Sequence, residues 1–488
     1  MKKLIFSLIL MFGITSHLLS QNASDALRYS RIFYGGTSRF QGMGGAFGAL
    51  GADFSVIATN PAGLGIYKSS EISISPSLSI NPTSSEYNGV TGDDTKSNFA
   101  LGNFGFVFTI KPDKTNKSGG FQSFNIALGM NRQNDFNSRI FMKGLNNSSS
   151  MMTDFVNILN NQLHLTSDEI NQQYPFDIAL ARNANLIYFD SVTNRFANDA
   201  PNGGVYQQKS VTTSGSINEF DLSFGGNYND KLYFGATIGI PSIRYFENTQ
   251  YQEFKERASI RYFQSLTYNQ SIETHGTGIN LKVGVIYRPA NWVRIGVSIH
   301  TPTYYGNMRD SWSSDMSASF DSLNSTPQSS PLGYYDYQMV TPFRAIGSLA
   351  FIVGQYGLIS AEYEYANYDQ ARFYSTESQA FNDVNDDIKA NYKAPLNIRF
   401  GTEWKIQDFR LRGGFGYYGE PYQSGINSGK KLIASGGLGY RGKHFFTDIA
   451  YVWTQTKQEY YFYDKTLVNP SYNTLSSNTV IATFGFRF

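Results

Sequence analysis

The sequence predicts an all-β protein: a transmembrane antiparallel β-barrel of about 14 strands, with an N-terminal hatch plugging its lumen. Charged residues form only 16% of the 488 residues, and aromatic residues form another 16%. Soluble domains carry about 25% charge, so this chain is short of polar surface. No segment after residue 20 has the roughly 18 consecutive apolar residues that a membrane helix needs. Many segments instead alternate apolar and polar residues, as strands with one face in lipid do.

The first 20 residues have the three parts of a secretory signal peptide. Lys2 and Lys3 precede an apolar stretch from Leu4 to Ile14, which small and polar residues follow. The mature chain is expected to begin near Gln21, and the bacterial outer membrane is the expected location. The chain has no cysteine, which excludes disulfides, and its net charge of +2 indicates no nucleic-acid partner.

The last residues form the clearest predicted strand, because apolar side chains recur at every second position from Val480 to Phe488. The barrel-assembly machinery is the expected partner of the terminal Phe488. Similar runs occur at 232–240, 359–365, 396–406 and 409–418. Where charges occur in these runs they share one face, which is predicted to line the lumen.

The connections give a second indication, because outer-membrane barrels alternate short periplasmic turns with longer outer loops. Short turns are expected near Asn229-Asp230, Pro289-Asn291, Gln355-Gly357, Gln407-Asp408 and Gly442-Lys443. Long polar stretches lie at 134–214, 246–277, 303–341, 371–393, 419–430 and 458–475. This alternation predicts a barrel over residues 70–488, with its largest outer loop at about 134–214. The segment Phe254–Tyr268 is either the top of a tall hairpin or an additional strand pair.

The largest loop contains residues with helical spacing, which predict an outer lid. These are Met151, Met152, Phe155, Ile158 and Leu159. A second short helix is expected from Thr166 to Gln173, with Asp168 and Glu169 in its first turn. The lid residues either pack the loop onto the barrel mouth, which we prefer, or form a groove for a ligand.

Residues 21–69 do not alternate and are rich in Gly and Ala, with a turn signal at Asn60-Pro61 and Gly63. A barrel of this size leaks unless its lumen is filled, so this segment is the predicted hatch. The glycines from Gly42 to Gly48 do not form a dinucleotide site, because no strand precedes them and no βαβ unit follows. They are expected to let the hatch backbone lie against the wall.

Several motifs resemble one known family. In the hatch they are Gly36-Thr37 with Arg39, Met43-Gly44-Gly45-Ala46-Phe47, Asp53 and Asn60-Pro61-Ala62-Gly63-Leu64. Weaker matches are His300-Thr301-Pro302, Thr341-Pro342 with Gly347, and Lys393-Ala394-Pro395 with Gly401. The chain thus resembles the FadL-type outer-membrane transport proteins, which carry long-chain fatty acids and other hydrophobic compounds such as aromatic hydrocarbons.

The resemblance implies a fourteen-stranded barrel with a gating hatch. It implies that substrate moves from an outer groove to a pocket above the hatch, and that part of the route opens sideways through the wall. The expected hatch and gating residues are Gly44, Gly45, Asp53, Asn60, Pro61, Ala62 and Gly63. The Asn60-Pro61 turn is the part expected to move, and Gly63 would permit the backbone change.

Catalytic and metal-binding motifs are missing from the sequence. His164, His275, His300 and His444 have no metal-ligand spacing, and neither Gly-x-Ser-x-Gly nor HExxH occurs. We therefore expect no enzyme, no metal and no cofactor. His300, at a predicted strand end, is expected to be a hydrogen-bonded structural residue.

Three arginines are predicted on the lumenal face of two neighbouring strands: Arg399, Arg410 and Arg412. They could hold the carboxylate of an acidic lipid through charge-assisted hydrogen bonds. Alternatively, Glu403 and hatch carboxylates such as Asp53 neutralise them, which is the interpretation we prefer.

The expected function is passive uptake of hydrophobic small molecules such as long-chain fatty acids, gated by the hatch. The expected partners are such a substrate and outer-membrane lipid. The alternative is a barrel used as a scaffold or shuttle in protein export, binding proteins through its outer loops. A soluble β-propeller is disfavoured by the signal peptide and the uneven loop lengths.

Overall fold

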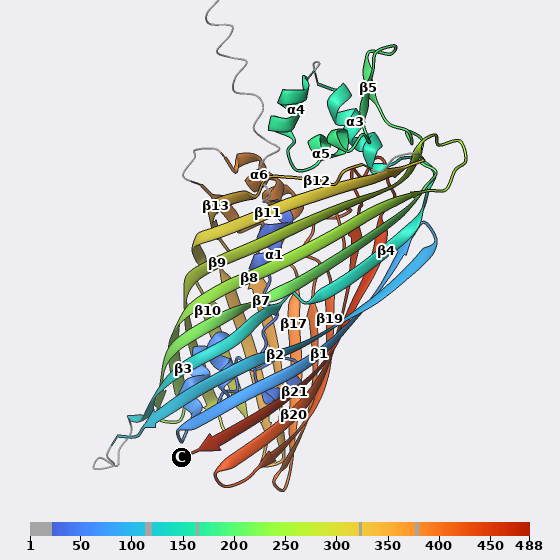
Figure 1. The fold of residues 1–488 in the computed structure, drawn as a ribbon. Coiled ribbons are helices and arrows are strands. Elements are labelled where there is room, and N and C mark those ends of the chain that lie inside the picture. Colours follow the sequence, from blue (N-terminus) through green and yellow to red (C-terminus); the bar gives the residue numbers. More distant parts are fainter. Residues whose placement is uncertain (1–21, 113–119, 163–164, 322–324, 376–379) are drawn as a thin grey trace, which may run out of the picture.

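The computed structural model describes residues 22–112, 120–162, 165–321, 325–375 and 380–488. The predicted signal peptide lies outside these residues. Figure 1 shows a tall barrel of tilted strands, with the N-terminal part of the chain inside it and helices at its upper end.

In the described residues, fourteen antiparallel strands form the wall, which confirms the predicted architecture. They are β1 (Glu71–Tyr87), β2 (Val90–Ile110), β3 (Phe121–Asp135) continued by β4 (Ser138–Asn146), β7 (Val205–Tyr228), β8 (Leu232–Lys255), β9 (Phe263–Ala290), β10 (Val293–His300) continued by β11 (Tyr304–Phe320), β13 (Gly333–Val340) continued by β14 (Arg344–Val353), β15 (Gly357–Ala366), β17 (Asn397–Ile406), β18 (Phe409–Tyr418), β19 (Lys431–Arg441), β20 (Phe445–Tyr460) and β21 (Ser471–Arg487). Short strands β12 (Gln328–Ser329) and β16 (Arg372–Tyr374) pair at the outer end. Pairing of β1 with β21, which sets Ile72 opposite Phe486, closes the barrel.

All five predicted short turns join consecutive strands at the lower end. Asn229 and Asp230 have φ of 55° and 54°, and Gln407 has φ of 55°. Asn and Asp tolerate this left-handed conformation, which tight hairpins require. The C-terminal Phe488 is exposed at the same end, where its backbone N–H donates to the Ser70 carbonyl at 3.1 Å.

The outer half of the wall settles one open alternative and corrects one predicted boundary. Residues 254–268 form the top of one tall β8–β9 hairpin and no additional pair. The predicted loop at 134–214 is too long, because β4 and the start of β7 occupy its two ends and leave the loop at 147–204. Each face of these strands mixes apolar and polar residues, so the regular alternation that reveals a strand in sequence is lost.

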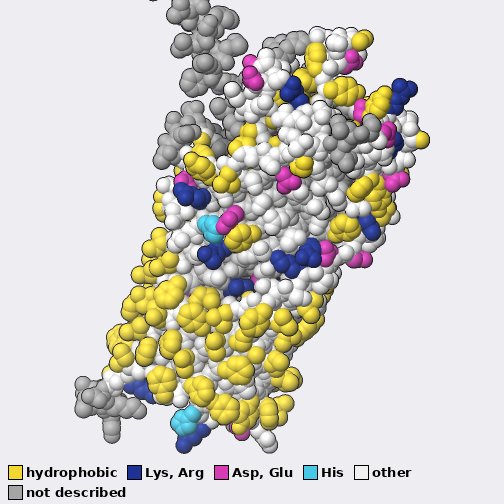
Figure 2. Space-filling view, viewed as in Figure 1, with side chains coloured by type: hydrophobic (Ala, Val, Ile, Leu, Met, Phe, Trp, Pro, Cys, Tyr) yellow, Lys and Arg dark blue, Asp and Glu magenta, His cyan; other side chains and the backbone are white. Residues whose placement is uncertain are grey.

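An apolar belt covers the lower half of the barrel face seen in Figure 2. Each strand of the wall contributes at least one exposed apolar residue: Ile74, Phe106, Leu128, Phe224, Ile238, Val283, Val297, Phe351, Ile359, Phe400, Leu411, Leu438, Ile449 and Phe484. Polar and charged side chains cover the surface above it. A closed wall with a lipid-facing apolar band is that of a transmembrane barrel of the bacterial outer membrane.

No helix in the part of the chain that the structure describes is long and apolar enough to cross a bilayer.

The outer loop 147–204 folds into a cap. It contains α3 (Met151–Asn160), α4 (Ser167–Gln173), α5 (Ile178–Asn183) and the hairpin of β5 (Tyr188–Asp190) and β6 (Arg195–Ala197). Met151, Met152, Phe155 and Leu159 are buried and Ile158 is partly buried, in one cluster with Met142, Tyr251 and Met316 of the barrel mouth. The lid residues thus pack the loop onto the mouth.

The N-terminal segment, residues 22–70, lies inside the barrel (Figure 1). It contains α1 (Ala23–Ser30), α2 (Ser38–Gly42) and the 3-10 helices η1 (Phe54–Ala58) and η2 (Pro61–Ile66). Its upper end, α1, shares a buried cluster with α6 (Asn382–Asn391) of an outer loop, which also holds η3 (Tyr368–Gln370). Its lower end leads into β1.

Small residues let this segment touch the wall. A Cβ on Gly48 would lie 2.1 Å from Ser348 Oγ, and one on Gly44 would lie 2.9 Å from Phe415 N. Gly44 also has φ of +62°, which disfavours other residues there.

Candidate functional site

The Asn60-Pro61-Ala62-Gly63 motif forms a buried, capped turn. Asn60 Oδ1 accepts from the Ala62 N–H at 3.1 Å and caps η2, with Pro61 at its first position. Asn60 Nδ2 donates to Gly48 O at 2.5 Å and to Val285 O of β9 at 3.4 Å. One amide therefore joins two parts of the segment to the wall. Movement of this turn stays a prediction.

Asp53 has a different role from the one considered in the sequence. Its carboxylate accepts from Thr37 Oγ1 at 2.9 and 2.7 Å and from the Ser55 N–H at 3.0 Å. It thus caps η1 and connects two turns of the N-terminal segment. No described ion pair joins it to an arginine, which corrects the suggestion that it neutralises the lumenal cations.

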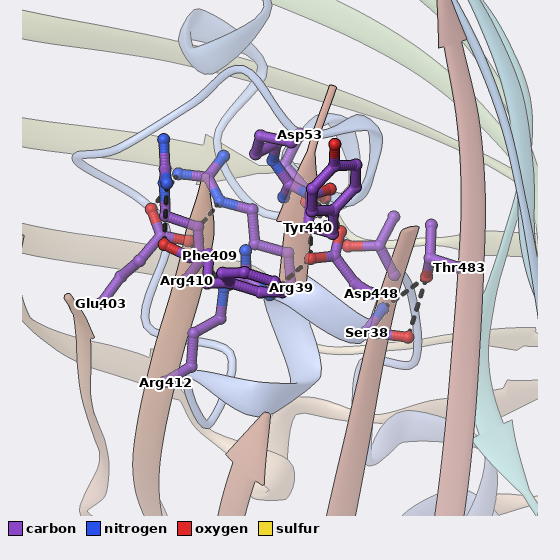
Figure 3. Close-up of polar contacts among 12 residues, drawn as sticks. Ser38, Arg39, Asp53, Glu403, Phe409, Arg410, Arg412, Tyr440, Asp448 and Thr483 are labelled. Atoms are coloured by element: carbon purple, nitrogen blue, oxygen red, sulfur yellow. Dashed lines mark hydrogen bonds and ion pairs between the residues drawn. The ribbon is translucent and has the colours of Figure 1, made fainter. Parts of the chain in front are cut away.

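A ladder of ion pairs crosses the lower lumen (Figure 3). Arg39 of the N-terminal segment binds both Glu403 oxygens, at 2.9 and 3.0 Å. Arg412 binds Glu403 at 2.6 Å and Asp448 at 2.7 Å. Arg410, at the turn below, donates instead to carbonyl oxygens of its own turn. Glu403 therefore fastens the segment to the wall.

Arg399 is enclosed in a similar way higher in the lumen. Its Nε donates to Glu362 at 2.9 Å, and Nη2 donates to Glu364 at 2.9 Å. Its Nη1 donates to Tyr418 at 2.7 Å. Because carboxylates already occupy Arg399 and Arg412, the structure favours neutralisation over binding of a ligand carboxylate by these two residues.

The wall also binds backbone groups of the N-terminal segment. Glu362 accepts from the Gly48 N–H at 2.6 Å, and Ser38 N–H donates to Thr483 Oγ1 at 2.7 Å. His300 Nε2 donates to the Thr59 carbonyl at 2.7 Å. This contact is the hydrogen-bonded role expected for His300.

A cavity of about 740 Å³ lies between the N-terminal segment and the wall. The segment contributes Arg31, Phe33, Tyr34, Gly44 and Gly45 among others. The wall contributes inward residues of β1, β3, β4 and of β19 to β21. Two of the predicted hatch glycines thus border an open space, whereas the Asn60 turn lies away from it.

The wall beside this cavity has a seam where strands are not paired. Among the described residues, the β2–β3 ladder ends at Asn103 opposite Asn131, and β4 beyond it pairs only with β7. Side chains of β1 and β2 bridge the seam. They are Asn81 to Asn137 O at 2.7 Å, Thr83 to Arg139 O at 2.6 Å, Lys96 to Thr213 O at 2.5 Å and Asn98 to Asp135 at 3.2 Å.

The N-terminal segment binds β3 just beyond the last β2 pair. Phe33 N–H donates to Gln133 O at 2.9 Å, and Gly35 N–H donates to Arg132 O at 2.7 Å. Asn134 Nδ2 donates to Arg31 O at 3.1 Å. The segment therefore contacts the wall at the seam, and moving residues 31–35 would change the cavity and the seam together.

Sequence reasoning missed the cavity residues Arg31, Phe33 and Lys431. Arg31 and Phe33 lie in a segment without periodicity, so nothing in the sequence gave their direction. The lumenal position of Lys431 could have been predicted, because it begins the alternating run of β19 and shares a face with Ile433 and Ser435.

Solved structures share this fold. A FadL homologue from Pseudomonas aeruginosa matches with a TM-score of 0.53 and 11% identity, covering 94% of this chain and 100% of that one. The toluene transporter TodX of Pseudomonas putida matches at 0.51 and 12%, covering 93% and 99%. The toluene transporter TbuX of Ralstonia pickettii matches at 0.50 and 15%, covering 93% and 98%. No protein-family model and no curated protein sequence matches the chain.

Proposed function

We propose that this protein is an outer-membrane channel for passive uptake of hydrophobic and amphipathic small molecules, such as long-chain fatty acids. The N-terminal segment is its gate, and the channel performs no catalysis and needs no cofactor. The cavity of about 740 Å³ between this segment and an unpaired part of the wall carries the proposal. Transport by structural neighbours named as toluene transporters supports it.

The proposed route enters the cavity from the outer side and leaves into the membrane through the lower end of the seam, where the β2–β3 ladder stops next to Phe106 of the belt. Each side-chain hydrogen bond across the seam contributes about 0.5–1.5 kcal/mol, and the seam has no continuous backbone ladder. It therefore opens more easily than other parts of the wall. A sideways exit lets an apolar solute pass from the lumen into lipid without crossing the polar lipid headgroups.

A cysteine pair tests this route, because the native chain has no cysteine. Asn98→Cys with Asp135→Cys places two thiols across the seam. Oxidation or a short thiol crosslinker is expected to reduce uptake of labelled oleate by a host lacking its own uptake system, and reduction is expected to restore it.

The matched control joins Gln250→Cys to Asn269→Cys, which lie directly opposite on the paired strands β8 and β9. Crosslinking there should leave uptake unchanged. Full uptake through a barrel with a verified seam crosslink would contradict the sideways route.

A second candidate is the protein-export scaffold. The β5–β6 hairpin favours it, because Tyr188, Phe189 and Val192 are 46%, 48% and 92% exposed. Replacing these three residues by serine should then release a stoichiometric protein partner and leave oleate uptake intact. A barrel isolated in mild detergent without any protein partner would count against this candidate.

A further inference from the structure

Two cations in the cavity lie against the same aromatic ring. Arg31 Cζ is 4.9 Å from the centre of the Phe33 ring, and Lys431 Nζ is 3.8 Å from it. The ring also contacts Tyr418 edge-on, with centroids 5.1 Å apart. Arg31 comes from the N-terminal segment and Lys431 from the outer end of β19, so this pair spans the gate and the wall.

The pair lacks the acids that accompany other cations of the cavity. Arg28 is bound by Asp25, Arg132 by Asp135, and Arg399 by Glu362 and Glu364. In the described ranges, neither Arg31 nor Lys431 has a carboxylate within 4.0 Å. The buried Arg31 Nε has no hydrogen-bond partner there either.

The carboxylates that line the cavity are engaged elsewhere. Asp135 accepts from Arg132 at 2.8 Å, Glu247 accepts from Tyr245, and Glu459 accepts from Tyr461 at 3.4 Å. Two like charges held together without a counter-ion raise the free energy of the folded state. An anion between them removes that cost and gains charge-assisted hydrogen bonds.

The rest of the cavity wall shows what such an anion would contact. The stretch formed by β1, β20 and β21 carries the hydroxyls of Ser77, Ser79, Thr454, Thr456, Ser477 and Thr479. Ile140, Val452 and Ile481 add apolar contacts. Ser77 Oγ already donates to Ala100 O at 3.2 Å, and Ser79, Ser477 and Thr479 bond one another within the wall. Each hydroxyl oxygen has two acceptor lone pairs, so this stretch also offers hydrogen bonds to a ligand with polar substituents.

We infer that the cavity binds an amphipathic organic anion bearing hydroxyl or similar groups, with its carboxylate between Arg31 and Lys431. This inference rests on the proposed function, because that function makes the bound ligand a transported substrate. It assigns the channel a substrate class distinct from neutral hydrocarbons. Because Asn134 holds the Arg31 carbonyl beside the seam, a bound anion also sits where the N-terminal segment meets β3.

Calorimetry on the full barrel in phosphatidylcholine nanodiscs tests the inference, with empty nanodiscs correcting for lipid partitioning. The probes are 3-hydroxydecanoate, decanoate and 1-decanol. Decanoate is expected to bind about tenfold to hundredfold more tightly than decanol, as hydrogen bonds to charged groups imply. The 3-hydroxy acid is expected to bind more tightly than decanoate.

Lys431→Gln should bring decanoate close to the affinity of decanol, and Lys431→Arg should retain most of the difference. Lys457→Gln, an exposed lysine on β20, is the matched control and should change nothing. Equal binding of decanoate and decanol by the native barrel, or an unchanged ratio in folded Lys431→Gln, would overturn the inference.

Uptake measurements separate this result from the proposed function. Charge-selective binding without decanoate uptake into proteoliposomes would support the anion site and contradict transport. Uptake of both decanol and decanoate without any charge selectivity in binding would support transport and overturn the anion site.

Discussion

Basic residues have opposite surroundings in the lower lumen and at the cavity. In the lower lumen, Arg39 and Arg412 share Glu403, which joins the N-terminal segment to the wall. At the cavity, Arg31 and Lys431 share only the Phe33 ring. The comparison shows that a lumenal cation with acidic partners has a structural role, whereas a cation without them is available to a ligand. These partners come from other strands, so the cation's own strand does not predict them.

The largest effect is expected from Glu403→Gln, which leaves Arg39 and Arg412 together with only Asp448. Breaking a buried ion pair costs about 3–5 kcal/mol of unfolding free energy. Urea unfolding of the refolded barrel measures the loss. Asp336→Asn removes the acid of an exposed pair with Arg309 and should give no resolvable change. Similar small losses of unfolding free energy in both variants would show that the Glu403 ion pairs do not stabilise the lower lumen.

Gly48→Ala tests how closely the backbone of the N-terminal segment is held against the wall of the lower lumen. Its Cβ would meet Ser348 Oγ at 2.1 Å and Glu362 Oε2 at 2.5 Å, so the segment has to shift. Overpacking of this kind costs about 1–3 kcal/mol. Faster proteolysis within residues 22–70 is the expected readout. Gly413→Ala, with Thr402 Cγ2 as its nearest contact at 3.8 Å, is the control. Unchanged proteolysis in Gly48→Ala would mean that the lower attachment is loose.

Asn60→Ala removes the cap of η2 and the link to Val285. Loss of such a cap costs about 1 kcal/mol, so the barrel should remain heat-stable while oleate uptake falls. Thr166→Ala removes the side-chain cap of α4 in the outer loop and should leave uptake at its native rate. Native uptake in a folded Asn60→Ala barrel would exclude the turn from gating.

Lys431→Gln should have the smallest effect on stability, although it has the largest effect on anion binding. It removes a charge without a bound acid, so the unfolding free energy should stay constant or rise slightly. A loss comparable to that of Glu403→Gln would show that an acid neutralises Lys431 after all. The contrast between the two regions would then disappear.

The wall was predictable where it meets lipid and not above it. In the belt, alternation around Ile238 or Phe400 reveals both the strand and its orientation, because one face is apolar. In β4 and the upper parts of β8 and β9, apolar residues such as Met142 and Tyr251 share a face with polar ones, so alternation is lost and the strands were assigned to loops. Helical spacing at Met151 and Phe155 is retained in the cap, because one face of that helix packs onto the barrel mouth.

The site was predictable only in part, because pairing across strands decides it. Arg399 was correctly placed on the lumenal face, and its acids Glu362 and Glu364 alternate on the adjacent strand. Their contact was therefore within reach of the sequence. Asp53, by contrast, was assigned to the arginines although Thr37 and Ser55 bind it. Local capping of a 3-10 helix leaves no periodic signal.

The threading of the N-terminal segment brings the two ends of the described chain together. The segment runs down through the lumen from α1, beneath the outer loops, and becomes β1, which pairs with the last strand. Ser38 donates both its N–H and its hydroxyl to β21, at Thr483 and Ile481. The strand that closes the wall is therefore also one that holds the segment inside it, so closure of the barrel and retention of the segment depend on the same strand.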